Sequence, residues 1–416
     1  MRPQGTVRAG RYVRTLPGYQ AFVPAPLPPD PPIATDDPEL QVLLANAALE
    51  LGRLDMLGAP GVLPNPDLFV AAYVRKEAVL SSQIEGTQAS LLDVFEYEAN
   101  GGREALGDDV AEVVNHVRAM NHGLKRLATL PLSLRLIREI HAELMTGVRG
   151  AQRQPGEFRT SQNWIGPPGA TLSEAQFVPP HPDDMRQALA DLEKFLHDES
   201  PMPPLVKVAL IHSQFETIHP FLDGNGRIGR LLITFYLCQQ GVLRRPLLYI
   251  SHFFRKHRVE YYERLQAVRD DGDWEGWVEF FLRGVTDVAR EATETASEIL
   301  AMRAEHQAIA ATFKTRGAGA LVDQLCERPV VSIPQVAERV AVSFPTAGKL
   351  VERFVEAGLL TVIPGVQHPR LFVYAPYVAL LAEGTIPEGD QPTHSKPGDT
   401  TAPQALGRRE RPFEDS

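Results

Sequence analysis

The sequence predicts a mainly α-helical protein that ends in a winged helix-turn-helix domain. Apolar residues recur every three or four positions through most of residues 39–314, which is the spacing of amphipathic helices. A glycine-rich loop at residues 223–226 separates two of these helices. From residue 317, three short helical patterns precede two β-type runs that begin at Thr361 and Arg370, which is the element order of a winged helix. The 416 residues suffice for two or three domains.

The composition indicates a soluble protein of a reducing cytoplasm. The sequence is 44% hydrophobic and 23% charged, and its net charge of −10 argues against a surface dedicated to nucleic acid. No apolar run approaches the roughly 20 residues that cross a bilayer, and no apolar segment follows the N-terminal arginines, so neither a membrane span nor a secretory signal is expected. Cys238 and Cys326 lie in apolar helical patterns, which favours core positions over a disulfide or a metal site.

The N-terminal region divides into a proline-rich arm, residues 1–38, and a set of helices, residues 39–110. The proline content of the arm predicts extended, polyproline-like chain that lies along the surface. The alternative is that the arm is a ligand for a proline-binding domain. The second helix ends in Ser81–Gly86, where Gly86 is typical of the residue that follows a helix. Glu85 would stand at a helix C-terminus, where the helix dipole disfavours a carboxylate unless a cation meets it. An arginine partner would meet this need, and exposure to solvent is the alternative.

Residues 111–285 form the predicted core. Helical patterns over residues 108–128 and 132–147 precede an irregular segment with the sequences GEFR and QNWIG. Ala170–Pro180 then predicts a short two-stranded β-hairpin flap.

A helix-loop-helix in this core carries the candidate chemistry. Its first helix, about residues 205–218, delivers His219 at its C-terminal end, where Pro220 stops it. The sequence DGNG turns the chain, and a second helix runs to Gly241. A glycine-rich loop that opens a helix presents free backbone N–H groups and the positive end of the helix dipole. The sequence therefore predicts a phosphate-binding turn.

The side chains of the turn fit this prediction. Arg227 and Arg230 can give charge-assisted hydrogen bonds to phosphates, and Asp223 is a hard oxygen ligand for a Mg²⁺ ion shared with the substrate. His219 titrates near neutral pH and is the candidate general base. The alternative is a helix-end histidine beside a solvated turn with two surface arginines.

The stretch from His219 to Arg230, HPFLDGNGRIGR, resembles the H-x-F-x-[D/E]-G-N-G-R-x-x-R signature of the Fic family at every specified position. The resemblance covers about residues 70–285. It implies a Fic-type helical core that binds ATP with Mg²⁺ and transfers AMP to a hydroxyl side chain of a protein, releasing pyrophosphate. His219 would deprotonate the target hydroxyl, and Asp223 would hold the Mg²⁺ ion that bridges the α- and β-phosphates.

The resemblance also implies how the phosphates are held. The loop around Gly224, Asn225 and Gly226 would cradle them as an anion hole. Arg227 would support them, and Arg230 would clamp the γ-phosphate. Because the glycine-asparagine-glycine centre is intact, the resemblance favours AMP transfer over phosphoryl or phosphocholine transfer.

A second element is similar to the [S/T]-x-x-x-E-[G/N] inhibitory motif of the family, with Ser81, Glu85 and Gly86 at its specified positions. The resemblance implies that Glu85 pairs with Arg230 in the place of the γ-phosphate, so that ATP binds only unproductively. A restraint of about 2.7 kcal/mol leaves about 1% of molecules competent, and one desolvated charge-assisted pair can supply it. In the family, the flap pairs with an extended target segment by main-chain hydrogen bonds.

Three segments follow the core: a bridging helix at residues 286–316, the winged helix-turn-helix domain at 317–384, and a predicted disordered tail at 385–416. Lys and Arg balance Asp and Glu over residues 316–384, six of each, so the net charge there is zero. One interpretation of this domain is DNA binding, which needs a basic face. Because the net charge is zero, the alternative is a module for protein interaction or dimer support.

The sequence thus favours a self-restrained protein adenylyltransferase whose partners are ATP and a protein target, the chain itself included. Removal of AMP from modified proteins by the same site, with Glu85 orienting a water, stays open as an alternative. So do a DNA-binding transcription regulator with a nucleotide-sensing core and a hydroxyl phosphotransferase that binds ATP in reverse. The target, the modified residue type, the release of Glu85 and the oligomeric state, a homodimer included, are left open.

Overall fold

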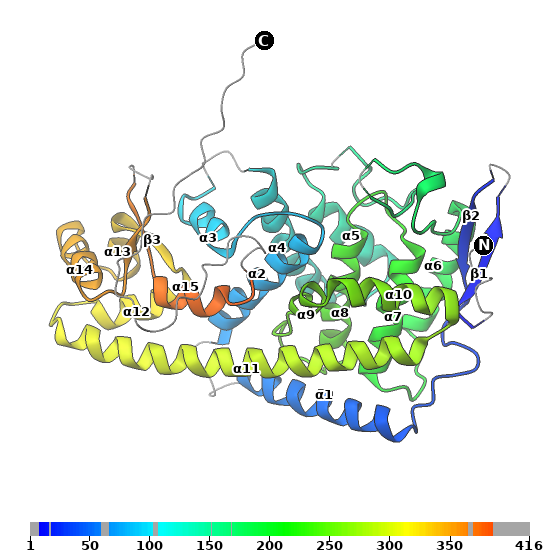
Figure 1. The fold of residues 1–416 in the computed structure, drawn as a ribbon. Coiled ribbons are helices and arrows are strands. Elements are labelled where there is room, and N and C mark those ends of the chain that lie inside the picture. Colours follow the sequence, from blue (N-terminus) through cyan, green and yellow to red (C-terminus); the bar gives the residue numbers. More distant parts are fainter. Residues whose placement is uncertain are drawn as a thin grey trace, which may run out of the picture.

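The fold is mainly helical, as predicted (Figure 1). The computed structural model describes residues 8–15, 18–59, 66–102, 107–150, 152–167, 169–364 and 369–385, so the predicted tail lies outside it from residue 386 onward. The elements up to the flap are β1 (Gly10–Arg14), β2 (Gln20–Pro24), α1 (Pro38–Leu57), α2 (Pro66–Ile84), α3 (Leu91–Ala99), α4 (Asp108–Leu127), α5 (Leu134–Leu144) and η1 (Leu172–Glu174). They are followed by α6 (Pro182–Leu196), α7 (Pro204–Ile218), α8 (Asn225–Gln239), α9 (Ser251–Lys256), α10 (Arg258–Asp271) and α11 (Trp274–Thr312). The C-terminal elements are α12 (Ala318–Glu327), β3 (Val330–Ser332), α13 (Ile333–Arg339), α14 (Phe344–Glu356), β4 (Thr361–Val362), β5 (Leu371–Val373) and α15 (Ala375–Ala382).

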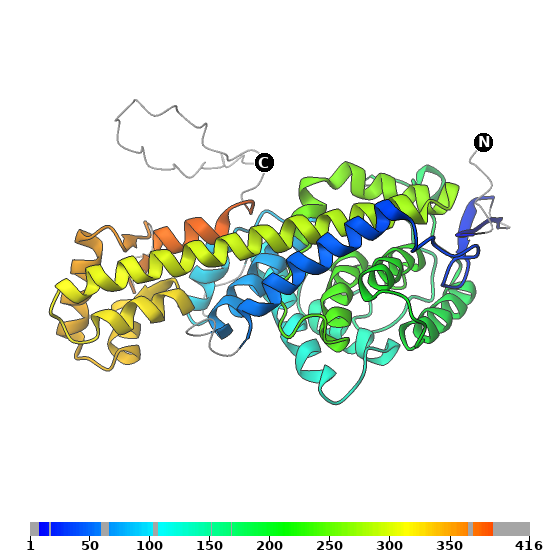
Figure 2. The ribbon, with the colours of Figure 1, turned by 90° about the horizontal axis from the view of Figure 1, so that it is seen from below.

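Helix α11 is the long axis of the molecule. It runs for 39 residues without a break, so the helix expected from Trp274 and the bridging helix expected at 286–316 are one element. Asp273 caps its start by accepting a hydrogen bond from the Gly276 N–H. Helix α1 packs along it in both views (Figures 1 and 2), and the C-terminal domain sits at its far end. This helix therefore connects the core to the C-terminal domain.

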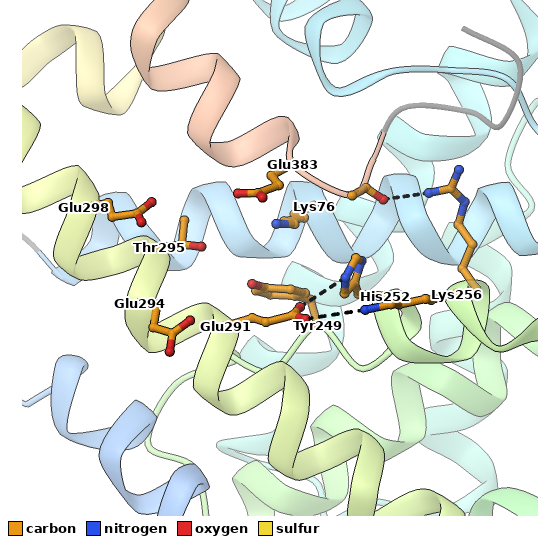
Figure 3. Close-up of a pocket in the computed structure, with 11 residues that line it drawn as sticks. Lys76, Tyr249, His252, Lys256, Glu291, Glu294, Thr295, Glu298 and Glu383 are labelled. Atoms are coloured by element: carbon orange, nitrogen blue, oxygen red, sulfur yellow. Dashed lines mark hydrogen bonds and ion pairs between the residues drawn. The ribbon is translucent and has the colours of Figure 1, made fainter. Parts of the chain in front are cut away.

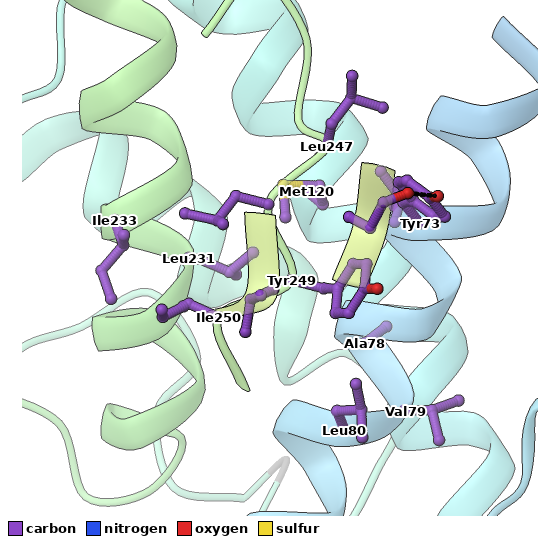
Figure 4. Packing of buried hydrophobic residues seen from close by; sticks show 14 of the residues in the cluster. Tyr73, Ala78, Val79, Leu80, Met120, Leu231, Ile233, Leu247, Tyr249 and Ile250 are labelled. Atoms are coloured by element: carbon purple, nitrogen blue, oxygen red, sulfur yellow. Dashed lines mark hydrogen bonds between the residues drawn. The ribbon is translucent and has the colours of Figure 1, made fainter. Parts of the chain in front are cut away.

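The core around the predicted turn is built from α2, α7 and α8. Helix α7 is buried on every side after its first residue, as expected for a helix in the centre of a domain. Apolar side chains of α2, such as Tyr73 and Leu80, lie in the same core as Leu231 and Ile233 of α8 (Figure 4). The two helices that carry the predicted inhibitory and phosphate-binding residues thus share one core. No helix in the described part of the chain is long and apolar enough to span a bilayer.

The N-terminal arm differs in part from the prediction. Instead of polyproline-like chain alone it contains a β-hairpin, in which β1 and β2 pair antiparallel. Phe22 of β2 is buried, and its N–H donates to the Val178 carbonyl at 2.9 Å. Arg8 pairs with Glu275 at 2.6 Å. Ala21, Phe22 and Pro24 of β2 are buried, whereas β1 buries only Gly10, so the burial does not alternate strictly and the proline content of the arm obscured the strands. The arm lies along the surface of the core, as expected.

The flap starts earlier than predicted. Its limbs meet at one antiparallel bridge between Ile165 and Phe177, where the Ile165 N–H donates to the Phe177 carbonyl at 2.9 Å. The segment between them contains the short 3₁₀ helix η1, whose Thr171 and Glu174 side chains form a capping box. Ala170–Pro180 therefore supplies one limb and the tip, and the other limb comes from the QNWIG sequence.

The C-terminal domain contains the three helices and the hairpin that the sequence predicts, α12 to α14 with β4 and β5. The strand β3, which was not predicted, completes a sheet of order β3-β5-β4. Helices α15 and α6 were also missed. Exposed positions of α14 carry Lys349 and Arg353 together with Glu352 and Glu356, so the positive and negative side chains of this helix balance. Cys326 is buried, as expected of a core position, whereas Cys238 is half-buried.

Candidate active site

The predicted turn is held in shape by its own asparagine. His219 ends α7 in the left-handed conformation, with φ 48°, and Gly224 precedes α8 with φ 75°. Between them, Asn225 Oδ1 accepts from the Phe221 N–H and Asn225 Nδ2 donates to the Phe221 carbonyl, both at 2.8 Å. Phe221 is fully buried. The Asn225 side chain therefore fixes the loop. Asn225 can then bind an anion through its backbone N–H and not through its side chain.

A carboxylate lies against the first turn of α8. Gly224 is the N-cap, so no side chain caps the first N–H groups of the helix. A Cβ on Gly226 would stand 2.2 Å from Glu85 Oε1, and only glycine leaves room for this carboxylate. The carboxylate lies where backbone N–H groups and the helix dipole favour negative charge.

Glu85 is held there by Arg230. Arg230 Nη2 donates to Glu85 Oε1 at 2.7 Å and to the Ser81 carbonyl at 2.9 Å, and its Nε donates to Ser81 Oγ at 2.8 Å. Arg230 is 1% exposed, whereas the Glu85 side chain is 37% exposed. Burial raises the pKa of Glu85, but Arg230, with Arg227, outweighs it and lowers the pKa below its usual value. Glu85 is therefore ionised near neutral pH.

Arg227 and Asp223 lie at the same turn. Arg227 is 4% exposed, and its Nη1 donates to Glu112 Oε2 at 3.1 Å. Its Nε is buried and has no hydrogen-bond partner in the described chain, so it is a donor ready for an anion. Asp223 Oδ1 accepts from the Gly224 N–H at 2.7 Å. The structure thus brings the predicted acid, glycines and arginines together.

The surroundings of Asp223 fit a Mg²⁺ ion shared with a nucleotide. Mg²⁺ in such sites is held by one or two carboxylates together with substrate phosphates and water. The Asp223 side chain is 35% exposed, and within the described residues its Oδ2 forms an ion pair with Arg153 alone, at 3.4 Å. This oxygen is accessible and weakly engaged, as a ligand for a shared ion must be.

His219 is placed to accept a proton. Burial, followed by the charges of Arg159 and Arg269, lowers the pKa of His219 to about 4, so the imidazole is neutral at pH 7. The backbone carbonyl of His219 accepts hydrogen bonds from Arg159 Nε at 3.0 Å and from Asn163 Nδ2 at 3.1 Å. The segment that leads into the flap therefore fixes the backbone of the candidate base.

Several positioning residues were missed because they lie far from the turn in sequence. Arg159 and Asn163 belong to the GEFR and QNWIG sequences, whose polar residues in irregular chain were the available signal. His141 of α5 stacks on Phe221, with ring centroids 3.7 Å apart, and its Nε2 lies 3.1 Å from the Asp223 carbonyl. The signal for His141 was a histidine on the apolar face of a helix. Nothing in a local pattern pointed to Glu112 as the partner of Arg227.

Two family models match the chain: the Fic/DOC family over residues 131–237 and the Fic/DOC family N-terminal region over residues 41–125. The protein adenylyltransferase Fic of Drosophila virilis is 29% identical over 237 residues, which is 56% of this chain and 42% of that protein. The protein adenylyltransferase Fic of Aedes aegypti is 33% identical over 151 residues, which is 36% of this chain and 27% of that protein. The chain thus spans less than half the length of these curated relatives.

A solved structure has the same fold. The crystal structure of a Fic family protein from Desulfovibrio desulfuricans G20 superimposes with a TM-score of 0.50 at 22% identity, covering 80% of this chain and 95% of that one. The helical core and the two family matches agree. Residues 131–237 thus form a Fic/DOC domain, and residues 41–125 a Fic/DOC N-terminal region.

Proposed function

We propose that this chain transfers AMP from ATP to a hydroxyl side chain of a protein and that Glu85 restrains the reaction. The observation that carries the proposal is the Glu85 carboxylate itself. It lies against Gly226 at the start of α8 and accepts a 2.7 Å hydrogen bond from Arg230. A carboxylate in this place acts as an internal substitute for a phosphate group.

In the proposed reaction, the hydroxyl oxygen of the target attacks the α-phosphorus of ATP. A new P–O bond forms, the bond to pyrophosphate breaks, and neutral His219 takes the hydroxyl proton on its ring. Arg227 Nε and the first N–H groups of α8 hold the phosphates. Asp223 would hold Mg²⁺, which neutralises phosphate charge when bound. Each of these groups lies on or beside one turn, so the chain orients the reaction mainly through positioning.

The proposed restraint acts through Arg230. Arg230 Nη2 and Nε donate hydrogen bonds to Glu85 and Ser81. A γ-phosphate that binds the same guanidinium would therefore have to displace Glu85. Ser81 is fully buried and Glu85 is partly exposed. Glu85 can therefore leave while Ser81 stays and keeps the guanidinium oriented.

The test is the intact mass of the purified chain after incubation with ATP and Mg²⁺. The original chain, Glu85→Gly, and Glu85→Gly combined with His219→Ala are compared. We expect an AMP adduct chiefly in Glu85→Gly and none in the double variant, because the base is lost. A phosphoryl adduct would replace the proposal with phosphotransfer. An adduct of equal yield in the double variant would remove His219 from its proposed role.

A further inference from the structure

A second pocket lies away from the candidate active site, between α2, α9, α11 and the chain that follows α15 (Figure 3). Its volume is about 470 Å³. Lys76 of α2 and Tyr249 are buried in its wall, with Thr295 of α11 beside them. Volumes of roughly 300–1,000 Å³ are typical of sites for small molecules. The pocket is thus large enough for a metabolite.

The Lys76 ammonium is the unusual feature of this pocket. The side chain is 2% exposed, yet in the described residues its Nζ has no hydrogen-bond acceptor and no carboxylate oxygen within 4 Å. It stands 4.5 Å from the centre of the Tyr249 ring, and a ring face does not replace the three acceptors that an ammonium can use. Burial lowers the pKa of Lys76 to about 8, so the group still carries its charge at pH 7. Glu291 and Glu383 act on this charge from a distance, and the ammonium, which lines the pocket without a protein acceptor, can take an anionic group of a ligand as its partner.

A second buried lysine, Lys207, does have a hydrogen-bond acceptor within the chain. Lys207 is 4% exposed and stands 5.0 Å from the centre of the Phe195 ring, so its burial and its aromatic neighbour match those of Lys76. Its Nζ, however, donates to the Asp198 carbonyl. The absence of such an acceptor at Lys76 is therefore a property of the pocket and not of buried lysines in this fold.

The rim of the pocket holds more carboxylates than cations. Glu294, Glu298 and Glu383 are exposed there, and none of them forms an ion pair within the described chain. Glu291 differs, because it contacts His252 Nε2 at 3.1 Å and Lys256 at 4.0 Å. Arg255 and Lys256 also line the pocket, so a ligand that entered would meet a mixed rim in which Glu294, Glu298 and Glu383 form no ion pair within the described chain, and the buried Lys76 ammonium below it.

We propose that this pocket binds a small zwitterion of the amino-acid class. The carboxylate of the ligand accepts hydrogen bonds from Lys76 Nζ, and its ammonium group lies among Glu294, Glu298 and Glu383. A simple anion such as phosphate would satisfy Lys76 but would add negative charge beside Glu294, Glu298 and Glu383. A simple cation would fit the rim and leave Lys76 without a partner.

The pocket also touches the helix that bears the inhibitory motif. Lys76 lies on α2, which ends at Glu85, and Gln83 Nε2 of the same helix donates to the Thr385 carbonyl at 2.9 Å. Arg255 donates to the Gly384 carbonyl at 2.7 Å. A ligand held by Lys76 and Glu383 would thus bind the inhibitory helix and the C-terminal segment together. The site itself does not depend on the proposed AMP transfer.

The test measures binding to the full chain without nucleotide. Thermal unfolding is recorded with each of the twenty standard L-amino acids, and any that raises the melting temperature is titrated by calorimetry. We expect at least one saturable response. The amide of the responding amino acid, which lacks the carboxylate, is expected to bind at least about tenfold more weakly to the original protein.

Two lysine variants provide the matched comparison. Lys76→Met is expected to weaken the response at least about tenfold and to leave the melting temperature without ligand no lower, because an unsatisfied ammonium is removed. Lys207→Met is expected to keep the response and to melt lower. The proposal is overturned if no amino acid binds, if the amide binds as well as the acid, or if Lys76→Met responds like the original chain.

Discussion

Replacing Glu85 by glutamine separates the charge of the restraint from its volume. Glutamine keeps the size of the side chain and removes the negative charge that faces Arg230. The pair is short, at 2.7 Å, and Arg230 is 1% exposed, but the Glu85 side chain is 37% exposed, so solvent screens part of the attraction. A hydrogen bond to a charged group contributes about 1.5–3 kcal/mol, and the exposure of Glu85 favours the lower end of this range.

The expected effect on AMP transfer follows from this energy. A loss of about 1.5 kcal/mol of restraint corresponds to a rate increase of about tenfold in Glu85→Gln. Glu85→Gly also clears the space over Gly226, where Glu85 Oε1 now stands 2.2 Å from the position of a Cβ, so it is expected to react faster still. The difference in rate between Glu85→Gln and Glu85→Gly measures how much the volume of the side chain, apart from its charge, restrains the reaction.

The assay is the initial rate of AMP incorporation at saturating ATP and Mg²⁺, followed by intact mass. Glu275→Gln is the matched control, because Glu275 pairs with Arg8 at 2.6 Å and is 36% exposed. Its rate is expected to equal that of the original chain. The reasoning is refuted if folded Glu85→Gln and Glu85→Gly are no faster than the original chain, or if Glu275→Gln is accelerated as much.

Three further predictions concern the base, the loop and the packing of α8. Because the pKa of His219 is lowered to about 4, its ring stays neutral as the pH falls through 6.5. The rate of AMP transfer by Glu85→Gly should therefore stay level from pH 8 to about pH 5. A decline in this rate centred on pH 6.5 would contradict the prediction. Asn225→Asp loses one of the two hydrogen bonds across the loop, and we expect about tenfold slower transfer with the protein still folded, as judged by circular dichroism. Gly123→Ala places a Cβ 2.3 Å from Phe235 Cζ of α8, and should lower the free energy of unfolding by about 1–3 kcal/mol despite better helix propensity. The helical control Gly52→Ala, which meets nothing within 4 Å, should raise it by up to about 1 kcal/mol in the same urea titration.

The sequence predicted the local geometry of the turn because that geometry is coded locally. Proline after His219 ends α7, and glycine at position 224 permits the φ of 75° that begins α8. The signature residues stand within twelve positions, so their placement on one turn follows from the chain itself. The helix ends at Ile218 and Ile84 were predictable for the same reason.

The partners of these residues could not be predicted from local patterns. Glu112 contacts Arg227 across 115 positions, and Arg159 reaches the His219 carbonyl across 60. Such pairs depend on how helices pack, which periodicity does not specify. The pairing of Glu85 with Arg230 was expected only through a family resemblance, since the residues themselves indicated no more than a need for some cation.

The place of Glu85 at a helix end explains how a strong contact can also be released. Ser81 and Ile84 are fully buried, so the body of α2 is fixed in the core. The final turn is different: Glu85 N–H donates to the Ser82 carbonyl three residues back, and Gly86, with φ 102°, follows it. Three-residue spacing gives weaker helical hydrogen bonds, and such turns fray first. Loosening one turn would therefore remove the carboxylate from Arg230 and leave the helix, the oriented guanidinium and the core intact. A partner or ligand that acts on the end of α2 needs to shift only that turn to change the state of the site.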